Sequence, residues 1–240
     1  MTAEGAPGSA LAVVAHPDDC EFSCGGTIAK WCAAGCRVTL VVLTDGLLGS
    51  HDPELGAREL AGRREAEQRH GAETLGIQGL QFWGQSDGHL RATAELVERL
   101  VGTVRTLRPE VVLGHDPWRH YQFHPDHIAA GKLVMAALYR AREPRLAVTF
   151  EEAELPAWRP SGAWLFGAQE VNHVEPVEAQ LDQKLTAILC HQSQAPTSMG
   201  FEPGDDDGER GFVEKFRARA AAAGFPAGFT AGEEFHVIEL

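Results

Sequence analysis

Short runs of Val and Leu alternate with segments of helical period along the first 142 residues of this chain. The apolar runs lie at 11–15, 38–44, 81–83 and 111–114, and the segments of helical period lie at 24–34, 57–75, 93–107 and 125–142. An alternation of strand and helix predicts an α/β fold with a mostly parallel sheet and helices on both of its faces. The 240 residues are enough to bury one substantial core, so we expect a single domain over 1–240.

The pattern weakens beyond residue 145, where prolines and turn residues interrupt the apolar pieces. A last sheet strand is predicted at 163–166, and a helix is predicted at 179–191 because Leu and Ile recur there at helical spacing. The segment 195–230 is interpreted as loop-rich and could serve as a substrate lid. Within it, the acidic and glycine-rich stretch 202–211 indicates a solvated loop, with a mobile lid or a cation site as the alternatives.

Acidic residues outnumber basic ones by 34 to 21, which gives a formal net charge of −13. The field of such a chain repels phosphate backbones and anionic membranes, so neither nucleic acid nor a membrane is an expected partner. No apolar run approaches the roughly 20 residues of a membrane span, and the N-terminus lacks the basic segment that opens a secretory leader. We therefore expect a cytoplasmic location.

The five cysteines are an odd number, which does not suit a disulfide framework, and we expect them to be reduced. Four of them follow one stripe of a predicted helix together with Ile28 and Trp31, namely Cys20, Cys24, Cys32 and Cys36. Such a stripe favours packing in the core over a metal cluster, and we expect the same of Cys190.

Polar clusters follow three of the predicted strands. They read HPDDCE at 16–21, TDG at 44–46 and HDPWRHYQFHPDH at 115–127. Ligands of open parallel sheets bind in the crevice beyond the carboxyl ends of the strands. These three segments are therefore expected to meet in space, although they lie far apart in the sequence.

The first cluster has the spacing of half a metal site. His16 and Asp19 are three residues apart, so one turn brings both side chains to the same side, while Asp18 points elsewhere. A third ligand is expected from HPDH at 124–127, whose two histidines are again three apart. Two imidazoles and one carboxylate suit Zn²⁺ with an open position for water, and they equally form the facial triad of Fe²⁺ enzymes. A hydrogen-bonded loop residue is the alternative for one histidine, but H-P-D at two strand ends favours a metal site.

These residues resemble the PIG-L/LmbE-like family of metal-dependent N-deacetylases, whose hallmarks are an AHPDD motif after the first strand and an HPDH motif farther along. The chain has AHPDDCE at 15–21 and HPDH at 124–127, and the resemblance covers most of 11–194. Further matching segments are GGTIA (25–29), LTDGLLGS (43–50), RREAEQRHGAETLG (63–76), SDGHL (86–90), RPEVVLGHDPW (108–118) and KLTAILCHQSQ (184–194). The resemblance implies a Rossmann-like α/β fold and hydrolysis of an acetamide, commonly on an N-acetylglucosamine moiety, with Zn²⁺ as the usual metal.

Carried onto the matching positions, the resemblance implies that His16, Asp19 and His127 are the metal ligands and that Asp18 is the general base for the water. Amide hydrolysis at neutral pH needs a strong nucleophile, and a metal lowers the pKa of a bound water to about 7. Asp18 is a free carboxylate beside two ligands, where it can accept the proton.

Four further residues receive roles from the same resemblance. His124 would face the metal, polarise the carbonyl oxygen and help to protonate the leaving amine, with Asp126 holding its tautomer. Arg64 would line the cavity, although a pair with Glu67 on a solvated helix face is the alternative. Asp87 would accept hydrogen bonds from sugar hydroxyls, and a simple turn is its alternative.

The chain departs from the family pattern before HPDH, where certain relatives have a tyrosine at the position of Gln122 and this chain has Tyr121 one step earlier. A tyrosine in the oxyanion site is therefore left open. The expected partner is a small N-acylated amino sugar or glycosylated metabolite, and apolar helix faces are compatible with a homo-oligomer. The alternatives to a deacetylase are a non-catalytic sugar-binding module and a non-haem iron enzyme that uses the same triad.

Overall fold

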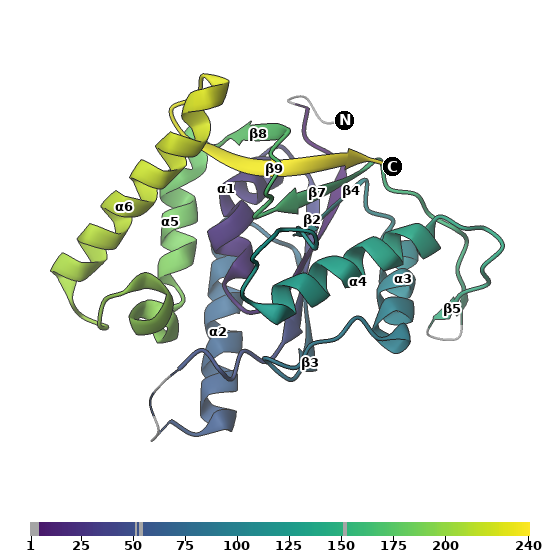
Figure 1. Ribbon diagram of the computed structural model, residues 1–240, viewed down its shortest axis with the longest axis horizontal. Helices are drawn as coiled ribbons and strands as arrows, with labels where there is room; N and C mark the ends of the chain where they lie inside the picture. Colours follow the sequence, from purple (N-terminus) through teal and green to yellow (C-terminus); the bar gives the residue numbers. More distant parts are fainter. Residues whose placement is uncertain (1–4, 51, 53–54, 151–152) are drawn as a thin grey trace.

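A seven-stranded sheet in the order β3-β2-β1-β4-β7-β9-β8 forms the centre of the computed structural model, which describes residues 5–50, 52, 55–150 and 153–240 (Figure 1). The strands of this sheet are β1 (Ser9–Val14), β2 (Arg37–Thr44), β3 (Gly79–Gln85), β4 (Val111–His115), β7 (Gly162–Phe166), β8 (His173–Pro176) and β9 (Gly232–Glu239). The helices are α1 (Asp19–Ala33), α2 (Ala57–Leu75), α3 (Ala94–Leu107), α4 (Pro125–Ala141), α5 (Leu181–Leu189) and α6 (Asp206–Gly224). A separate ribbon pairs β5 (Thr149–Phe150) with β6 (Ala153–Glu154). The predicted α/β fold with a mostly parallel sheet is confirmed.

The apolar runs form the middle of the sheet because both of its faces are covered. In β1, Leu11 and Val13 pack into the core cluster that contains α3 and α4, while Ala12 and Val14 pack into the cluster that contains α1. A strand that is buried on both faces reads as a continuous apolar run rather than as an alternation. β1 pairs in parallel with β2 on one side and with β4 on the other, so the carboxyl ends of these strands lie at one edge.

The last strand, β9, lies between β7 and β8 and is antiparallel to both. It also fixes α1, which is kinked at Cys24, where φ is −136°. Beyond the kink, the N–H groups of Gly26 and Thr27 each donate to the carboxylate of Glu233 at 2.8 Å. The ammonium of Lys184 donates to the same carboxylate at 2.5 Å. This buried ion pair therefore joins the end of the sheet to the helix that follows HPDD.

The segment 195–230 differs from its prediction as loop-rich. Ala195–Met199 forms one turn of π-helix, and most of the remainder is α6. Of the acidic stretch 202–211, residues 202–205 form an exposed turn and the rest is the beginning of this helix, where the Asp205 carboxylate accepts the N–H of Gly208 at 3.0 Å as an N-cap. The neighbouring helix α1 likewise begins at Asp19, five residues before its predicted start at 24.

All five cysteines are free thiols. Cys20, Cys24 and Cys36 are buried in the cluster beneath α1, as predicted. Cys36 nevertheless lies beyond the end of the helix and directly before β2, so it does not belong to the helical stripe. Cys190 is only half-buried at the end of α5, which corrects its assignment to the core.

None of the helices formed by the described residues is long and apolar enough to cross a membrane. The first four residues, part of the N-terminal stretch interpreted above as lacking a leader, lie outside the described residues.

Candidate metal centre and active site

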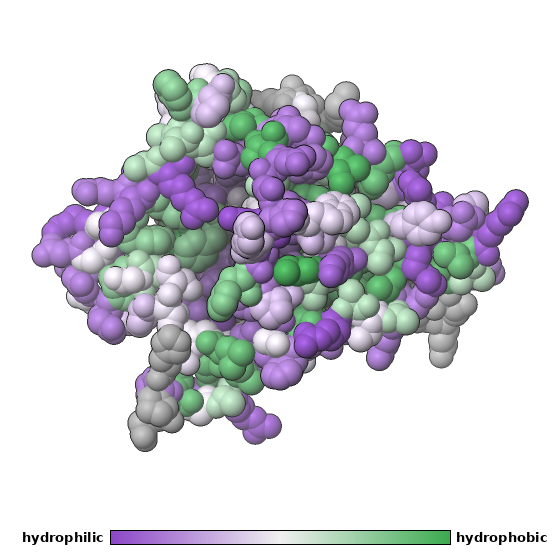
Figure 2. All heavy atoms as spheres, viewed as in Figure 1, coloured by the Kyte–Doolittle hydropathy of each residue, from purple (hydrophilic) through white to green (hydrophobic). Residues whose placement is uncertain are grey.

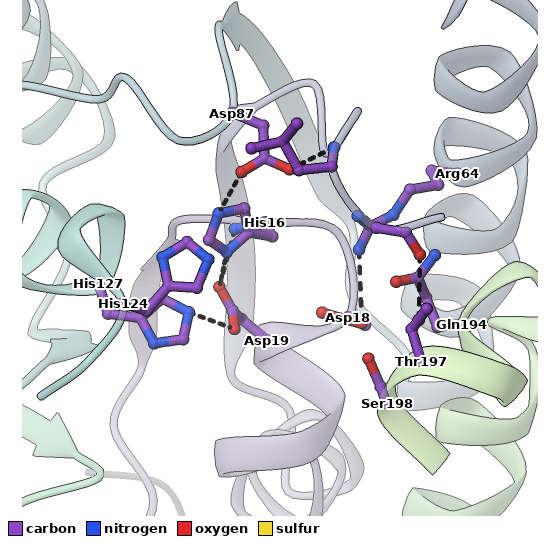
Figure 3. A pocket seen from close by; sticks show the side chains of 12 residues that line it. His16, Asp18, Asp19, Arg64, Asp87, His124, His127, Gln194, Thr197 and Ser198 are labelled. Carbon is purple, nitrogen blue, oxygen red and sulfur yellow. Dashed lines mark hydrogen bonds and ion pairs between the residues drawn. The ribbon is translucent and has the colours of Figure 1, made fainter. Parts of the chain in front are cut away.

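A pocket of about 260 Å³ opens at the edge of the sheet where the parallel strands end (Figure 3). All of the predicted site residues except Asp126 line it, namely His16, Asp18, Asp19, Arg64, Asp87, His124 and His127. The rest of the lining comes from Leu48, Gly49, Gln194, Thr197 and Ser198. The pocket thus brings together residues of the first and third polar clusters, and the second cluster adjoins it through the Gly46 carbonyl, which accepts from Arg64 at 2.7 Å.

The chain leaves β1 through a strained turn at Asp18. This residue has a φ of 101° and a ψ of −30°, a conformation that residues with a side chain rarely adopt. Its N–H donates to Oε1 of Gln68 at 3.0 Å. The guanidinium of Arg64 donates to the carbonyl of Pro17 at 2.5 Å and lies 3.4 Å from Oδ2 of Asp18. These contacts from α2 hold Asp18 on the Arg64 side of the pocket, whereas Asp19 faces the histidines (Figure 3).

Asp19 is the carboxylate around which the histidines gather. Its Oδ2 lies 3.3 Å from Nδ1 of His16 and 3.3 Å from Nε2 of His115, and its Oδ1 lies 3.1 Å from Nε2 of His127. Among the described residues, three overlapping sets have ligand atoms within 4.8 Å of one another: His16/His124/His127, Asp19/His115/His127 and His16/Asp87/Asp126. Each of the three predicted metal ligands belongs to at least one of these sets.

Three buried carboxylates, those of Asp19, Asp87 and Asp126, converge on His16. Nε2 of His16 lies 3.1 Å from Oδ1 of Asp87 and 3.4 Å from Oδ2 of Asp126, yet His16 Nε2 and Asp87 Oδ1 lack a hydrogen bond of good geometry. Burial lowers the pKa of His16, but Asp19 and Asp87 outweigh it and raise the pKa to about 10. The carboxylates therefore favour a positive charge at this place, which a proton on His16 or a divalent ion bound in its stead can supply. Such a cluster of oxygen and imidazole donors fits a divalent metal ion.

The other ionisable groups of the pocket are tuned mainly by burial. Burial raises the pKa of Asp18 to about 6, against the opposing effect of the Arg64 charge. It lowers the pKa of His115 to about 4, and it lowers the pKa of His124 below its usual value. At neutral pH, Asp18 is therefore a carboxylate that is more basic than an ordinary one, and both histidines are neutral.

The contact between Asp126 and His124 differs from the expected one. The carboxylate of Asp126 accepts the N–H groups of Gly88 at 2.6 Å and Leu90 at 3.1 Å. His124 is the N-cap of α4, and its Nδ1 accepts the backbone N–H of Asp126 at 3.3 Å. Since Nδ1 is an acceptor, a neutral His124 carries its proton on Nε2. The backbone of Asp126, rather than its carboxylate, therefore sets the tautomer.

Arg64 and Asp87 both reach the site, in roles that the sequence left open. Arg64 is 3% exposed and does not pair with Glu67, whose carboxylate accepts the N–H and hydroxyl of Ser193 at 2.8 and 2.5 Å. Asp87 is 5% exposed and faces the imidazole of His16. Although burial raises the pKa of Asp87, the contact with His16 lowers it to about 2. Asp87 therefore supports His16 and is not a simple turn residue.

The structure also adds residues that the sequence reasoning missed. His115 reaches Asp19; it opens the third polar cluster, but neither its spacing nor the resemblance assigned it a role. Gln68 contacts Asp18 from the middle of a helix, where nothing in the pattern distinguished it. Neither of the two tyrosines lines the pocket, because Tyr121 is fully exposed and Tyr139 is 67% exposed.

The fold and the site together define a class of α/β proteins with a histidine- and carboxylate-rich centre at the carboxyl edge of a mostly parallel sheet. A family model described as PIG-L, GlcNAc-PI de-N-acetylase, matches residues 11–138. The chain belongs to this family.

Two curated relatives are deacetylases of compounds that contain an N-acetylated amino sugar. The chain is 34% identical over 186 residues to the diacetylchitobiose deacetylase of Thermococcus kodakarensis, covering 78% of this chain and 70% of the relative. It is 31% identical over 270 residues to the 1D-myo-inositol 2-acetamido-2-deoxy-alpha-D-glucopyranoside deacetylase of Acidothermus cellulolyticus, covering 92% of this chain and 91% of the relative.

Solved structures confirm the fold. The N,N'-diacetylchitobiose deacetylase of Pyrococcus horikoshii superposes with a TM-score of 0.86 and 29% identity, covering 97% of this chain and 84% of that one. GalB, the 4-carboxy-2-hydroxymuconate hydratase of Pseudomonas putida, superposes with a TM-score of 0.76 and 22% identity over 97% and 96% of the two chains. The second likeness shows the fold alone, and since that protein is called a hydratase, the reaction has to be argued from the site.

Proposed function

We propose that this protein is a metal-dependent N-deacetylase that acts on a small compound containing an N-acetylated amino sugar. The observation that carries the proposal is the position of Asp18, a buried and strained carboxylate placed directly beside a metal-type donor set. A module that only binds sugar has no need of such a base. The family and both curated relatives support the reaction and the substrate class.

His16, Asp19 and His127 are the residues that would hold the metal, and Zn²⁺ suits them, with Fe²⁺ as the alternative. Asp19 lies beside each of the two histidines, with Oδ2 3.3 Å from Nδ1 of His16 and Oδ1 3.1 Å from Nε2 of His127. When bound, the ion supplies Lewis acidity that lowers the pKa of a water molecule to about 7. Asp87 supports His16 from the opposite ring nitrogen, as carboxylates beside metal-binding histidines commonly do.

Asp18 acts as the general base in this proposal. With a pKa of about 6 it is ionised at neutral pH, and it accepts a proton more readily than an unperturbed aspartate does. Arg64, 3.4 Å away, fixes the direction of the carboxylate through its contact with Oδ2. The strained turn prevents Asp18 from joining Asp19 among the histidines, so the base stays separate from the donor set.

His124 acts as the hydrogen-bond donor to the substrate carbonyl. Its Nδ1 is occupied by the N–H of Asp126, so Nε2 carries the proton that can be donated as negative charge develops on the carbonyl oxygen. Removal of one such donor commonly costs about 3 kcal/mol of transition-state stabilisation. The leaving amine can take the proton that Asp18 has accepted from the water, while the neutral His124 keeps its own proton as a hydrogen-bond donor.

The wall opposite the histidines suits a sugar. Gln194, Thr197 and Ser198 present amide and hydroxyl groups to the pocket, which can exchange hydrogen bonds with sugar hydroxyls (Figure 3). This wall comes from the π-helix turn and the residue before it, which supports a substrate-facing role for the beginning of the segment 195–230.

The test combines metal content with amine release for the parent protein, Asp18→Asn and His127→Ala. N-acetylglucosamine, N,N'-diacetylchitobiose and the N-acetylglucosaminyl inositol of the second relative serve as substrates. We expect about one metal ion per chain in the parent protein and in Asp18→Asn, with amine release reduced about 10²–10⁴-fold in Asp18→Asn. His127→Ala should lose both metal and activity. Full activity of Asp18→Asn would show that another group is the base, and a parent protein that binds these sugars without releasing amine would be a binding module.

A further inference from the structure

A second hollow, of about 300 Å³, lies beside the active-site pocket, between α1 and α6. It shares Asp18, Asp19 and Ser198 with that pocket, so the two spaces meet at the candidate base. We call it the aromatic groove, and its own lining residues are Phe22, Phe212, Phe216 and Arg219. Apolar side chains are visible in the recess between α6 and the body of the protein (Figure 2). A ligand that reaches past Asp18 therefore enters this groove.

The walls of the aromatic groove are three phenylalanine rings held in fixed relation. Phe212 and Phe216 lie four residues apart on α6, with ring centroids 5.8 Å apart. Phe22 of α1 makes edge contacts with both, at 6.3 and 6.1 Å. The three half-buried rings rest on a buried apolar layer formed by Ile188, Ala195, Met199 and Phe201. Because that layer restricts their motion, the rings offer a preformed surface for stacking.

Arg219 adds one positive charge to this apolar surface. It is exposed, and among the described residues it has no carboxylate partner within ion-pair distance. Arg217, two residues earlier on the same helix, pairs with Asp182, and Arg210 pairs with Asp207. In a chain with a net charge of −13, a guanidinium that lines a hollow without a partner suits an anionic group of a ligand.

We propose that the aromatic groove is the subsite for the part of the substrate beyond the N-acetylated sugar, and that it takes an aromatic aglycone that carries a carboxylate or another anionic substituent. The proposal rests on the proposed N-deacetylase function. A polyol or a second sugar needs a partner for each hydroxyl, whereas beyond its junction with the active-site pocket at Asp18 and Asp19 this groove offers Ser198 and Arg219 beside three phenylalanines. A flat apolar ring needs only the stacking surface, and its anionic substituent meets Arg219.

The test compares three β-glycosides of N-acetylglucosamine with methyl, phenyl and 4-carboxyphenyl aglycones, using amine release by the metal-loaded protein. Stacking should raise kcat/KM for the phenyl over the methyl glycoside by about tenfold. The carboxylate should add up to about fivefold, as expected of an exposed ion pair. Phe216→Ala, and Phe216→Leu if the first variant is unstable, should remove the preference for phenyl over methyl. Arg219→Gln should remove only the preference for carboxyphenyl over phenyl.

Two matched variants on the same part of the chain serve as controls. Arg217→Gln removes a neighbouring cation that points to Asp182, and Phe225→Ala removes an aromatic ring that is 81% exposed outside the groove. Both should keep all three substrate ratios. Calorimetric titration with the corresponding amine products measures the subsite without turnover, and we expect the 4-carboxyphenyl glucosaminide to bind most tightly.

The outcomes separate this proposal from the proposed function. Equal kcat/KM values for the three glycosides, or a clear preference for N,N'-diacetylchitobiose, would overturn the subsite and leave the deacetylase standing. No amine release from any glycoside would overturn the deacetylase, and the titrations would then decide on the subsite alone. The subsite would be supported if the 4-carboxyphenyl product bound most tightly and Arg219→Gln weakened that binding. Equal binding of all products would refute the subsite.

Discussion

The side-chain amide of Gln68 accepts the backbone N–H of Asp18 at 3.0 Å, at the point where Asp18 has a φ of 101°. The proposed base is therefore held in a costly conformation by a residue of α2, a helix whose sequence gives no sign of this contact. Strained residues persist where the surrounding structure determines their conformation, and they gather at functional sites.

The strain at Asp18 predicts that glycine is more stabilising than alanine at this position, the reverse of their usual order. Asp18→Gly and Asp18→Ala both remove the carboxylate and its contact with Arg64, but only glycine adopts a positive φ without a steric penalty. We expect Asp18→Gly to be more stable than Asp18→Ala by about 1 kcal/mol in urea unfolding, although glycine has the more flexible unfolded state. Both variants should lack amine release. An alanine variant as stable as the glycine variant would show that the turn is not strained.

Gln68→Leu should lower kcat more than it changes KM. The substitution leaves the N–H of Asp18 and Oε1 of Glu21, which accepts from Gln68 at 2.6 Å, without their partner. Each buried group left unpaired costs about 1–3 kcal/mol. Metal content should stay at the parent level because Gln68 contacts none of the proposed ligands. The exposed Gln192→Leu is the control, and a parent-like kcat in Gln68→Leu would remove Gln68 from the positioning of the base.

Chelation should lower the unfolding free energy of the parent protein. Without the ion, the carboxylates of Asp19, Asp87 and Asp126 have the histidines and the Arg64 charge to balance their own. A ligand present at a few hundred times its dissociation constant contributes about 3 kcal/mol, and EDTA should remove that contribution. His127→Ala should respond little to EDTA, whereas the exposed His120→Ala should behave like the parent protein. An equal response of all three proteins would place the metal elsewhere.

The buried pair Lys184–Glu233 should be strongly coupled. Both side chains are 4% exposed, and Glu233 also binds two N–H groups of α1. Lys184→Met leaves a buried carboxylate unpaired, so we expect a loss of about 3–5 kcal/mol in denaturant unfolding. The double variant Lys184→Met/Glu233→Gln should be less destabilised than the sum of the single variants. Breaking the exposed pair of Arg217 with Asp182 should cost less than about 1 kcal/mol, and a similar cost at Lys184 would contradict the coupling.

Glu175 should make the protein sensitive to acid. Burial raises its pKa, but His173 at 2.9 Å and Lys30 at 2.8 Å outweigh burial and hold the pKa below its usual value. A carboxylate with a depressed pKa in the folded state stabilises the protein above its unfolded pKa of about 4.3, and this stability is lost as the pH falls through the folded value. Below about pH 4, Glu175→Gln should therefore lose less unfolding free energy than the parent protein. The exposed Glu214→Gln should follow the parent curve.

The parallel core of the fold was predictable because its strands are buried on both faces. The runs that became β1, β2 and β4 are continuous and apolar, which distinguishes them from loops without any tertiary information. β9 reads EEFHVIE and mixes charged with apolar residues, because it is the antiparallel partner near the sheet edge. α6 fully buries only Ala220 and Gly224, and its stripe of Phe212, Phe216 and Ala220 is largely half-buried, so it is a weaker signal than a buried apolar run. Its acidic beginning was nevertheless a helix signal, since Asp205 is an N-cap and carboxylates favour the first turn.

The sequence predicted which residues line the candidate site better than it predicted which of their atoms are in contact. Motif spacing predicted that His16, Asp19 and the histidines of HPDH would meet, because the ends of parallel strands share an edge, and the resemblance chose His127 from the two histidines. The resemblance assigned Asp126 to His124, whereas its carboxylate binds backbone N–H groups of the loop after β3. Which of several neighbouring polar atoms pair depends on packing to within an ångström, and sequence spacing does not carry that information.

The insertion of β9 between β7 and β8 bears on how the chain folds as it emerges from the ribosome. Gly26 and Glu233, which form a direct hydrogen bond, are separated by 207 residues. The strands β1 to β4 can assemble early from neighbouring segments, but the half of α1 beyond its kink acquires its carboxylate cap only after Glu233 has been synthesised. A nascent chain can therefore hold a formed parallel core while its helix after HPDD is still incomplete, so the candidate site matures after the core.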